Sequence, residues 1–133
     1  MIEDKNLKRI LYVDDEPDIA EIVKLSLEKI GGFEVRVCDN GKEALKVIPE
    51  FMPDMVLLDV MMPEMDGPST LTELKGMEGF SDIPVVFVTA KVQPYEVQHF
   101  RQIGAADVIA KPFDPLTLSN QIRDIWSLAV AES

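Results

Sequence analysis

The chain alternates between short runs of apolar residues and longer stretches in which apolar residues recur at helical spacing. Five of the apolar runs have the length and composition of strands. We predict strands at Ile10–Val13, Phe33–Val37, Met55–Leu58, Pro84–Val88 and Ala106–Ala110. The helical spacing is clearest between residues 19 and 30 and between residues 118 and 129. The predicted order is a strand followed by a helix, repeated along the chain.

Residues that favour turns and helix caps mark the boundaries of the predicted helices. Gly31–Gly32 is expected to end the first helix, and Asn40–Gly41 and Gly67–Pro68 to open the second and third. Asp114 before Pro115 is typical of an N-cap followed by a first-turn proline, so we expect the last helix to begin there.

The strands Met55–Leu58 and Pro84–Val88 are apolar on successive residues rather than on alternate ones. This is the pattern of a parallel sheet whose two faces are both covered by helices. It predicts the α/β class with a doubly wound parallel sheet. A chain of 133 residues fits one domain, which we place at residues 1–133 with a core of about 8–128.

The charge excludes some classes of partner, because 24 acidic residues against 13 basic ones give a formal net charge of −11. Nucleic acids and anionic lipid surfaces would be repelled, so we expect neither as a direct partner. No apolar run approaches the ~20 residues that a membrane span requires. The single cysteine, Cys38, is expected to be a buried, unreactive thiol in a reducing compartment, and we predict a cytoplasmic protein.

Polar residues follow four of the predicted strands. Asp14 and Asp15 follow the first, Asp59 the third, Thr89 the fourth and Lys111 the fifth. In open parallel sheets ligands bind beyond the carboxyl ends of the strands, so we expect these side chains to share one edge. Crowded carboxylates repel one another unless a cation joins them, and oxygen donors without His or Cys favour Mg²⁺ over zinc.

Lys111 and Thr89 would add a positive charge and a hydroxyl donor to this edge. Such groups can hold phosphoryl oxygens while a carboxylate acts as the nucleophile. Phosphoryl transfer depends mainly on positioning and on neutralisation of charge. The set of residues therefore predicts phosphoryl-transfer chemistry.

Four motifs resemble those of response-regulator receiver domains of two-component signalling, and the resemblance covers nearly the whole chain. The motifs are Ile10–Glu16, Leu57–Gly67, Val88–Ala90 and Ala110–Phe113. The resemblance, closest in kind to single-domain chemotaxis regulators, implies a flavodoxin-like (βα)5 fold with strand order 2-1-3-4-5. It also implies a switch that promotes only its own phosphorylation and dephosphorylation, rather than an enzyme.

The resemblance assigns roles to the acidic residues. Asp59 would accept a phosphoryl group from a phosphohistidine on a histidine kinase or histidine phosphotransfer protein, and water would later remove it. Asp59, Asp15 and the backbone carbonyl of Met61 would bind Mg²⁺, with Mn²⁺ as a substitute. Asp14 would assist through water.

The resemblance also assigns roles around the phosphoryl group. Thr89 would donate a hydrogen bond to it, Lys111 would neutralise it, and the small Ala90 would leave it accessible. The Lys111–Pro112 bond is expected to be cis, which aims the lysine inward. Lys91 and Met61 occupy positions that tune how readily water reaches the phosphoryl group.

Val108 departs from the family pattern, which has Tyr or Phe three residues before the conserved lysine. Family members signal through the face formed by the fourth helix, fifth strand and fifth helix, where we expect the downstream protein target to bind. Without an aromatic ring at 108, we hypothesise that the signal relies on the fourth helix and its leading loop, Lys91–Tyr95, with Tyr95 as a substitute. We expect a monomer or weak dimer, either free-standing or part of a larger protein.

Other interpretations remain open at this point. Taken singly, Asp14 or Asp15 could cap the first helix, Thr89 could be an ordinary strand residue, and Lys111 a solvated charge. A haloacid-dehalogenase-type phosphatase also uses an aspartyl phosphate, but it expects a second Asp where this chain has Met61. A flavin-binding module and a phosphorylation-independent interaction module are further alternatives. His99 is expected on the surface.

Overall fold

The predicted apolar runs form five parallel strands in a computed structural model that describes residues 6–131. The strands are β1 (Arg9–Val13), β2 (Glu34–Cys38), β3 (Met55–Asp59), β4 (Val85–Thr89) and β5 (Asp107–Ala110). They make one sheet in the order β2-β1-β3-β4-β5, which confirms the predicted doubly wound α/β fold and its strand order.

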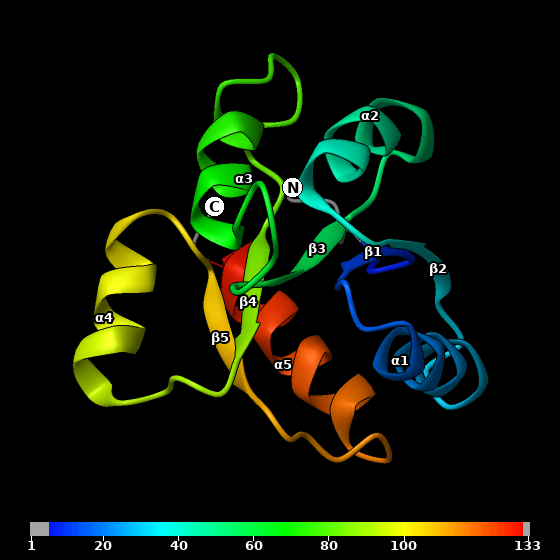
Figure 1. The fold of residues 1–133 in the computed structure, drawn as a ribbon. Coiled ribbons are helices and arrows are strands. Elements are labelled where there is room, and N and C mark those ends of the chain that lie inside the picture. The colour runs from blue at the N-terminus through cyan, green and yellow to red at the C-terminus, as the bar shows by residue number, and fades with distance from the viewer. Residues whose placement is uncertain (1–5, 132–133) are drawn as a thin grey trace.

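Five helices cover both faces of the sheet (Figure 1). They are α1 (Pro17–Lys29), α2 (Gly41–Phe51), α3 (Gly67–Lys75), α4 (Pro94–Gln102) and α5 (Leu118–Ala131). Buried residues of α1 and α5 pack on one face, and buried residues of α2, α3 and α4 on the other. This arrangement explains why the central strands are apolar on both sides.

The sheet therefore separates two apolar cores, which we call the first cluster (with α1 and α5) and the second cluster (with α2, α3 and α4). Strand β1 divides its side chains between them, because successive residues point to opposite faces. Ile10 and Tyr12 belong to the first cluster, whereas Leu11 and Val13 belong to the second.

The register of the sheet brings the carboxyl ends of its strands level. Val13 of β1 pairs with Leu58 of β3, and Thr89 of β4 pairs with Ala110 of β5. The residues that end or follow these strands are consequently neighbours at one edge of the sheet.

Side-chain caps open the second and third helices where the sequence predicts. Asn40 Oδ1 accepts a hydrogen bond from the backbone N–H of Glu43 at 2.8 Å, and Asp66 Oδ1 accepts one from Ser69 at 2.8 Å. Each bond satisfies an N–H that the first turn of a helix leaves unpaired.

Each predicted strand differs from the observed one by one residue at one end or both, and the last helix begins later than expected. Strand β2 runs one residue later than expected, because Glu34 and not Phe33 pairs with Arg9 at its start. Helix α5 begins at Leu118, because the backbone oxygen of Asp114 accepts hydrogen bonds from Thr117 and Leu118 and forms a separate turn before the helix. Asp114 thus caps this turn, with its Oδ1 accepting from Leu116 N–H at 2.9 Å, instead of capping α5 directly.

Candidate functional site

The polar residues predicted at the strand ends meet at the carboxyl edge of the sheet. Asp59 and Thr89 are the last residues of β3 and β4, while Asp14 and Lys111 directly follow β1 and β5. Asp14, Asp59 and Thr89 are almost fully buried, with exposed fractions of 1%, 4% and 3%. The structure thus brings together residues that lie up to 97 positions apart in the sequence.

Lys111 contacts the carboxylates of three acidic residues. Its Nζ lies 3.1 Å from Asp14 Oδ2, 3.5 Å from Asp59 Oδ1 and 3.7 Å from Glu16 Oε1. One ammonium therefore faces several negative charges. The surplus negative charge makes this edge of the sheet attractive to a further cation.

Asp14, Asp15 and Asp59 form the acidic cluster that the sequence predicts. Each contributes a carboxylate oxygen, and these oxygens all lie within 4.8 Å of one another. Asp15 is exposed and the other two are buried, so the cluster opens to solvent on one side. Hard oxygen donors in this arrangement fit Mg²⁺, which keeps several waters and needs only one or two carboxylates.

Burial raises the pKa of Asp59 to about 6, and the negative charge of Asp14 acts in the same direction. The positive charge of Lys111 and a hydrogen bond from the backbone N–H of Met61 lower it, but they do not compensate fully. The protein groups around Asp59 therefore disfavour a second ionised carboxylate beside Asp14. A bound cation would offset this effect.

The pKa of Lys111 is raised despite its burial. Burial by itself lowers it, but the hydrogen bond to Asp14 and the negative charges of Asp14, Asp59 and Glu16 outweigh that effect. The lysine is therefore held in its charged form. A charged lysine is the form that can neutralise a phosphoryl group.

Asp14 has a partner that sequence reasoning missed. The hydroxyl of Tyr12 donates a hydrogen bond of 2.6 Å to Asp14 Oδ2, the same oxygen that Lys111 contacts. Asp14 Oδ1 accepts from the backbone N–H of Glu16 at 2.9 Å, but Glu16 is itself the N-cap of α1 and the first turn has no side-chain cap, so Asp14 does not cap the helix. The signal for Tyr12 lay in the sequence, because residues two apart on a strand share a face.

The remaining predicted residues surround this core of the site. Thr89 Oγ1 accepts from the backbone N–H of Lys91 at 3.0 Å, and Ala90 and Lys91 are exposed beside it. The Lys111–Pro112 bond is cis, as expected. Met61 follows β3 with 64% of its surface exposed.

Val108 and His99 lie away from the carboxylates. Val108 of β5 is half-buried and packs against the second cluster. His99 is exposed on α4, which agrees with the sequence interpretation.

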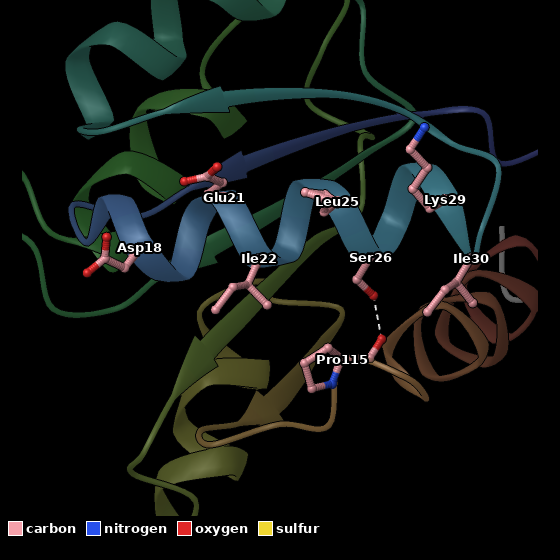
Figure 2. A pocket seen from close by; sticks show the side chains of 8 residues that line it. All are labelled: Asp18, Glu21, Ile22, Leu25, Ser26, Lys29, Ile30 and Pro115. Carbon is pink, nitrogen blue, oxygen red and sulfur yellow. Dashed lines mark hydrogen bonds between the residues drawn. The ribbon is translucent and has the colours of Figure 1, made fainter.

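An apolar groove lies beside the site, along the outer face of α1 (Figure 2). Its apolar walls are Ile22, Leu25 and Ile30, each about half exposed (52%, 51% and 53%), and Pro115, and its rim carries the charged Asp18, Glu21 and Lys29. The hydroxyl of Ser26 donates to the backbone oxygen of Pro115 and ties α1 to the loop between β5 and α5. A second apolar hollow shares Ile22 and Pro115 and extends to Ala90 and Lys111, so the groove is continuous with the site.

Comparison with known proteins identifies the family. Residues 10–123 match the response regulator receiver domain. The chain belongs to this family. The receiver is 40% identical over 118 residues to a probable transcriptional regulator, ycf27, of Pyropia yezoensis, and 38% identical over 116 residues to the DNA-binding response regulator MtrA of Mycolicibacterium smegmatis. The matches cover 89% and 87% of this chain but only 47% and 49% of those proteins, so the receiver spans about half their length.

Solved structures agree with this family. The chemotaxis response regulator CheY4 of Vibrio cholerae is 28% identical, with a TM-score of 0.83 over 90% of this chain and 99% of that one. A response regulator from Chloroflexus aurantiacus is 30% identical, with a TM-score of 0.82 over 92% and 99% of the two chains. Nearly the whole of each of these two chains aligns with the present chain. Within residues 6–131 we find no helix with the length and apolar character needed to cross a bilayer.

Proposed function

We propose that this receiver is a phosphorylation-dependent signalling switch in which Asp59 accepts a phosphoryl group from a phosphohistidine of a histidine kinase or histidine phosphotransfer protein. The observation that carries the proposal is the convergence of Asp59, Asp14 and Lys111 at one buried sheet edge, with Lys111 within 3.5 Å of both carboxylates. The family supports the same role, because receivers are the signalling domains of two-component systems.

The chemical step follows from the carboxylate of Asp59. One of its oxygens attacks phosphorus, the P–N bond to the donor histidine breaks, and the electron pair returns to the imidazole nitrogen. In the later dephosphorylation, water attacks phosphorus and the P–O bond to Asp59 breaks. The products are inorganic phosphate and the original carboxylate, with the proton of water passing to phosphate or solvent.

The surrounding residues would stabilise the negative charge of the phosphoryl group and would not form covalent bonds to it. Lys111 would pair with the phosphoryl oxygens, and Thr89 would donate its hydroxyl hydrogen to one of them. Asp59, Asp15 and the carbonyl of Met61 would hold Mg²⁺ or Mn²⁺, with Asp14 assisting through water. The metal ion would supply neutralisation of charge during transfer. Lys91 and Met61, both exposed beside the site, would set how readily water reaches the phosphoryl group.

The phosphodonor would lie against the apolar groove of α1. A helix that carries a phosphohistidine must bring its phosphorus to Asp59, and the groove leads from Ile22 and Pro115 to Lys111. Apolar side chains on the donor helix would cover Ile22 and Leu25, which are otherwise half exposed. The occupant proposed for the groove is therefore an amphipathic helix of the donor protein.

The signal would leave the receiver through the face of α4, β5 and α5. Tyr95 in the first turn of α4 is 71% exposed and follows the loop that leads from Thr89. Val108 is too small to take the role of the usual aromatic residue on β5. A downstream protein would therefore recognise α4 and its leading loop, where Tyr95 offers a large ring.

Phosphorylation with a small donor tests the proposal. Incubation with acetyl phosphate and Mg²⁺ should add one base-labile phosphoryl group, detected by intact-protein mass spectrometry. Asp59→Asn should remove the label, and so should chelation of the metal. Asp82→Asn is the matched control, because Asp82 lies exposed at the opposite edge of the sheet and should leave labelling unchanged.

Three measurements distinguish the proposed switch from the alternative functions. Equal labelling of Asp59→Asn would contradict the assignment of Asp59. Steady turnover of p-nitrophenyl phosphate would instead favour a phosphatase, whereas binding of a target that is equal with and without label would favour a phosphorylation-independent module.

A further inference from the structure

Asp14 is the most completely enclosed acid of the site, since its side chain has no exposed surface. Its Oδ1 accepts from Glu16 N–H, and its Oδ2 accepts both from Tyr12 and from Lys111. A buried carboxylate needs such donors, because an unpaired charge there is costly. Three donors therefore fix where Asp14 points.

Of these donors, Tyr12 has no role in the chemistry proposed above. Its side chain is 1% exposed and packs in the first cluster below the site. Its hydroxyl nevertheless donates a hydrogen bond to Asp14 Oδ2. This bond is 2.6 Å long, whereas the contact of Lys111 Nζ with the same oxygen is 3.1 Å. A tyrosine hydroxyl keeps its proton at neutral pH, so Tyr12 can donate to the ionised acid.

We infer that Tyr12 is a positioning residue, whose hydroxyl orients Asp14 for the metal site and keeps a donor on Asp14 Oδ2 when Lys111 turns to a phosphoryl group. The inference rests on the proposed function, which needs Mg²⁺ beside Asp59. Groups that orient the direct ligands of a metal commonly change its affinity by about 10- to 100-fold when they are removed, and the lower end applies here because Asp14 would reach the ion through water. Tyr12 would belong to this class of residue although it does not touch the ion.

Removal of one oxygen atom tests the inference. Tyr12→Phe keeps the ring and its packing, and it should weaken Mg²⁺ binding by about 10-fold, measured from backbone amide shifts during a Mg²⁺ titration. Thr72→Val is the control, because it removes one hydroxyl from an exposed side chain on α3 and should leave the dissociation constant unchanged. Thermal unfolding of both variants reports whether the fold is kept.

A spectroscopic measurement distinguishes positioning from packing. The chain has two tyrosines, so 3-fluorotyrosine incorporated into Tyr95→Phe labels position 12 alone. The ¹⁹F resonance beside the hydroxyl should shift during the Mg²⁺ titration with the same dissociation constant as the amides. This readout does not require the phenylalanine substitution at 12 to fold.

The outcomes are separable. If the unaltered protein binds no Mg²⁺, the proposed metal site fails, and the role of Tyr12 fails with it. If the unaltered protein binds Mg²⁺ while Tyr12→Phe binds within two-fold as tightly, or the ¹⁹F resonance stays fixed, only the inference on Tyr12 is overturned.

Discussion

The ring of Phe100 on α4 stands edge-on against the ring of Phe87 on β4, with centroids 5.0 Å apart and an interplanar angle of 82°. Phe87 pairs in register with Val108 of β5, so the small side chain of Val108 lies beside this aromatic pair. Phe87 also lies two residues before Thr89 on the same strand. The position of α4 is therefore coupled through an aromatic contact to the strand that ends in the site.

Truncation of Phe100 should loosen α4. The side chain is 7% exposed, and Phe100→Ala should lower the free energy of unfolding by about 3 kcal/mol, since it leaves a cavity against Phe87. Urea denaturation measures the change. Tyr95→Ala on the same helix is the control, because its exposed ring should alter stability by less than about 0.5 kcal/mol. Equal losses of unfolding free energy for the two variants would contradict the conclusion that the contact between Phe100 and Phe87 holds α4 in place.

Gly67 should resist any larger residue, because the first turn of α3 packs directly on the end of β3. A Cβ at this position would lie 2.7 Å from the backbone oxygen of Asp59 and 2.9 Å from Val60 Cα. Gly67→Ala should cost about 2 kcal/mol and weaken Mg²⁺ binding, because it displaces the backbone around Asp59.

Gly76 offers the matched comparison at the other end of α3. A Cβ there would find its nearest atom at 3.5 Å, which is ordinary contact. Gly76→Ala should be neutral or stabilise the fold by up to about 1 kcal/mol. Thermal unfolding of the two variants distinguishes a steric clash at Gly67 from a general destabilisation by alanine in α3. Similar losses of stability in both variants would refute the steric explanation.

The raised pKa of Asp59 predicts a pH-dependent stability of the metal-free protein. Its pKa rises from 3.8 to about 6 on folding, so the folded state favours the protonated acid. The associated stability is fully present below about pH 4 and is lost as the pH rises through about 6. At neutral pH, Asp59→Asn should therefore be more stable than the unaltered protein by about 2 kcal/mol.

Chemical denaturation between pH 3.5 and 8 checks this expectation. The advantage of Asp59→Asn should shrink toward zero at the acid end, and saturating Mg²⁺ should reduce it at neutral pH by stabilising the unaltered protein. Asp82→Asn is the control, because its exposed side chain lies at the opposite edge of the sheet. A constant difference across the range would mean that Asp59 does not titrate as its burial requires.

Cys38 should be unreactive in the folded receiver. It ends β2 with 1% of its surface exposed, and burial, together with the nearby Glu43, raises the pKa of its thiol to about 12. At pH 8, an aromatic disulfide reagent should label it only at the rate of unfolding, whereas 6 M guanidinium should give labelling at once. Rapid labelling of the native protein would place the thiol nearer the surface.

The strands and the polar residues at their ends could be predicted because both depend on local pattern. The apolar runs around Leu57 and Phe87 fix the strands, and a parallel sheet then gathers Asp14, Asp59 and Lys111 at one edge. No distance is needed for that conclusion. The fold class and the grouping of the site therefore follow from the pattern of residues, whereas the strand order was predicted from the resemblance to receiver domains.

What could not be predicted depends on register and on competition between nearby partners. The spacing of Tyr12 and Asp14 places their side chains on one face, but the hydrogen bond between them also depends on the side-chain rotamers, which the spacing leaves open. The start of α5 at Leu118 depends on the turn that precedes it. In this turn the backbone oxygen of Asp114 accepts hydrogen bonds from both Thr117 and Leu118. The groove beside Pro115 depends on how α1 meets the loop after β5.

The hydrogen bond from Ser26 to Pro115 has a consequence for how a partner would associate. It joins the helix and the loop that form the two walls of the groove, so the shape of the groove is set before anything arrives. A surface assembled in advance loses little conformational entropy on contact. Association with the phosphodonor would then be rapid without high affinity. The complex would dissociate readily once Asp59 is phosphorylated.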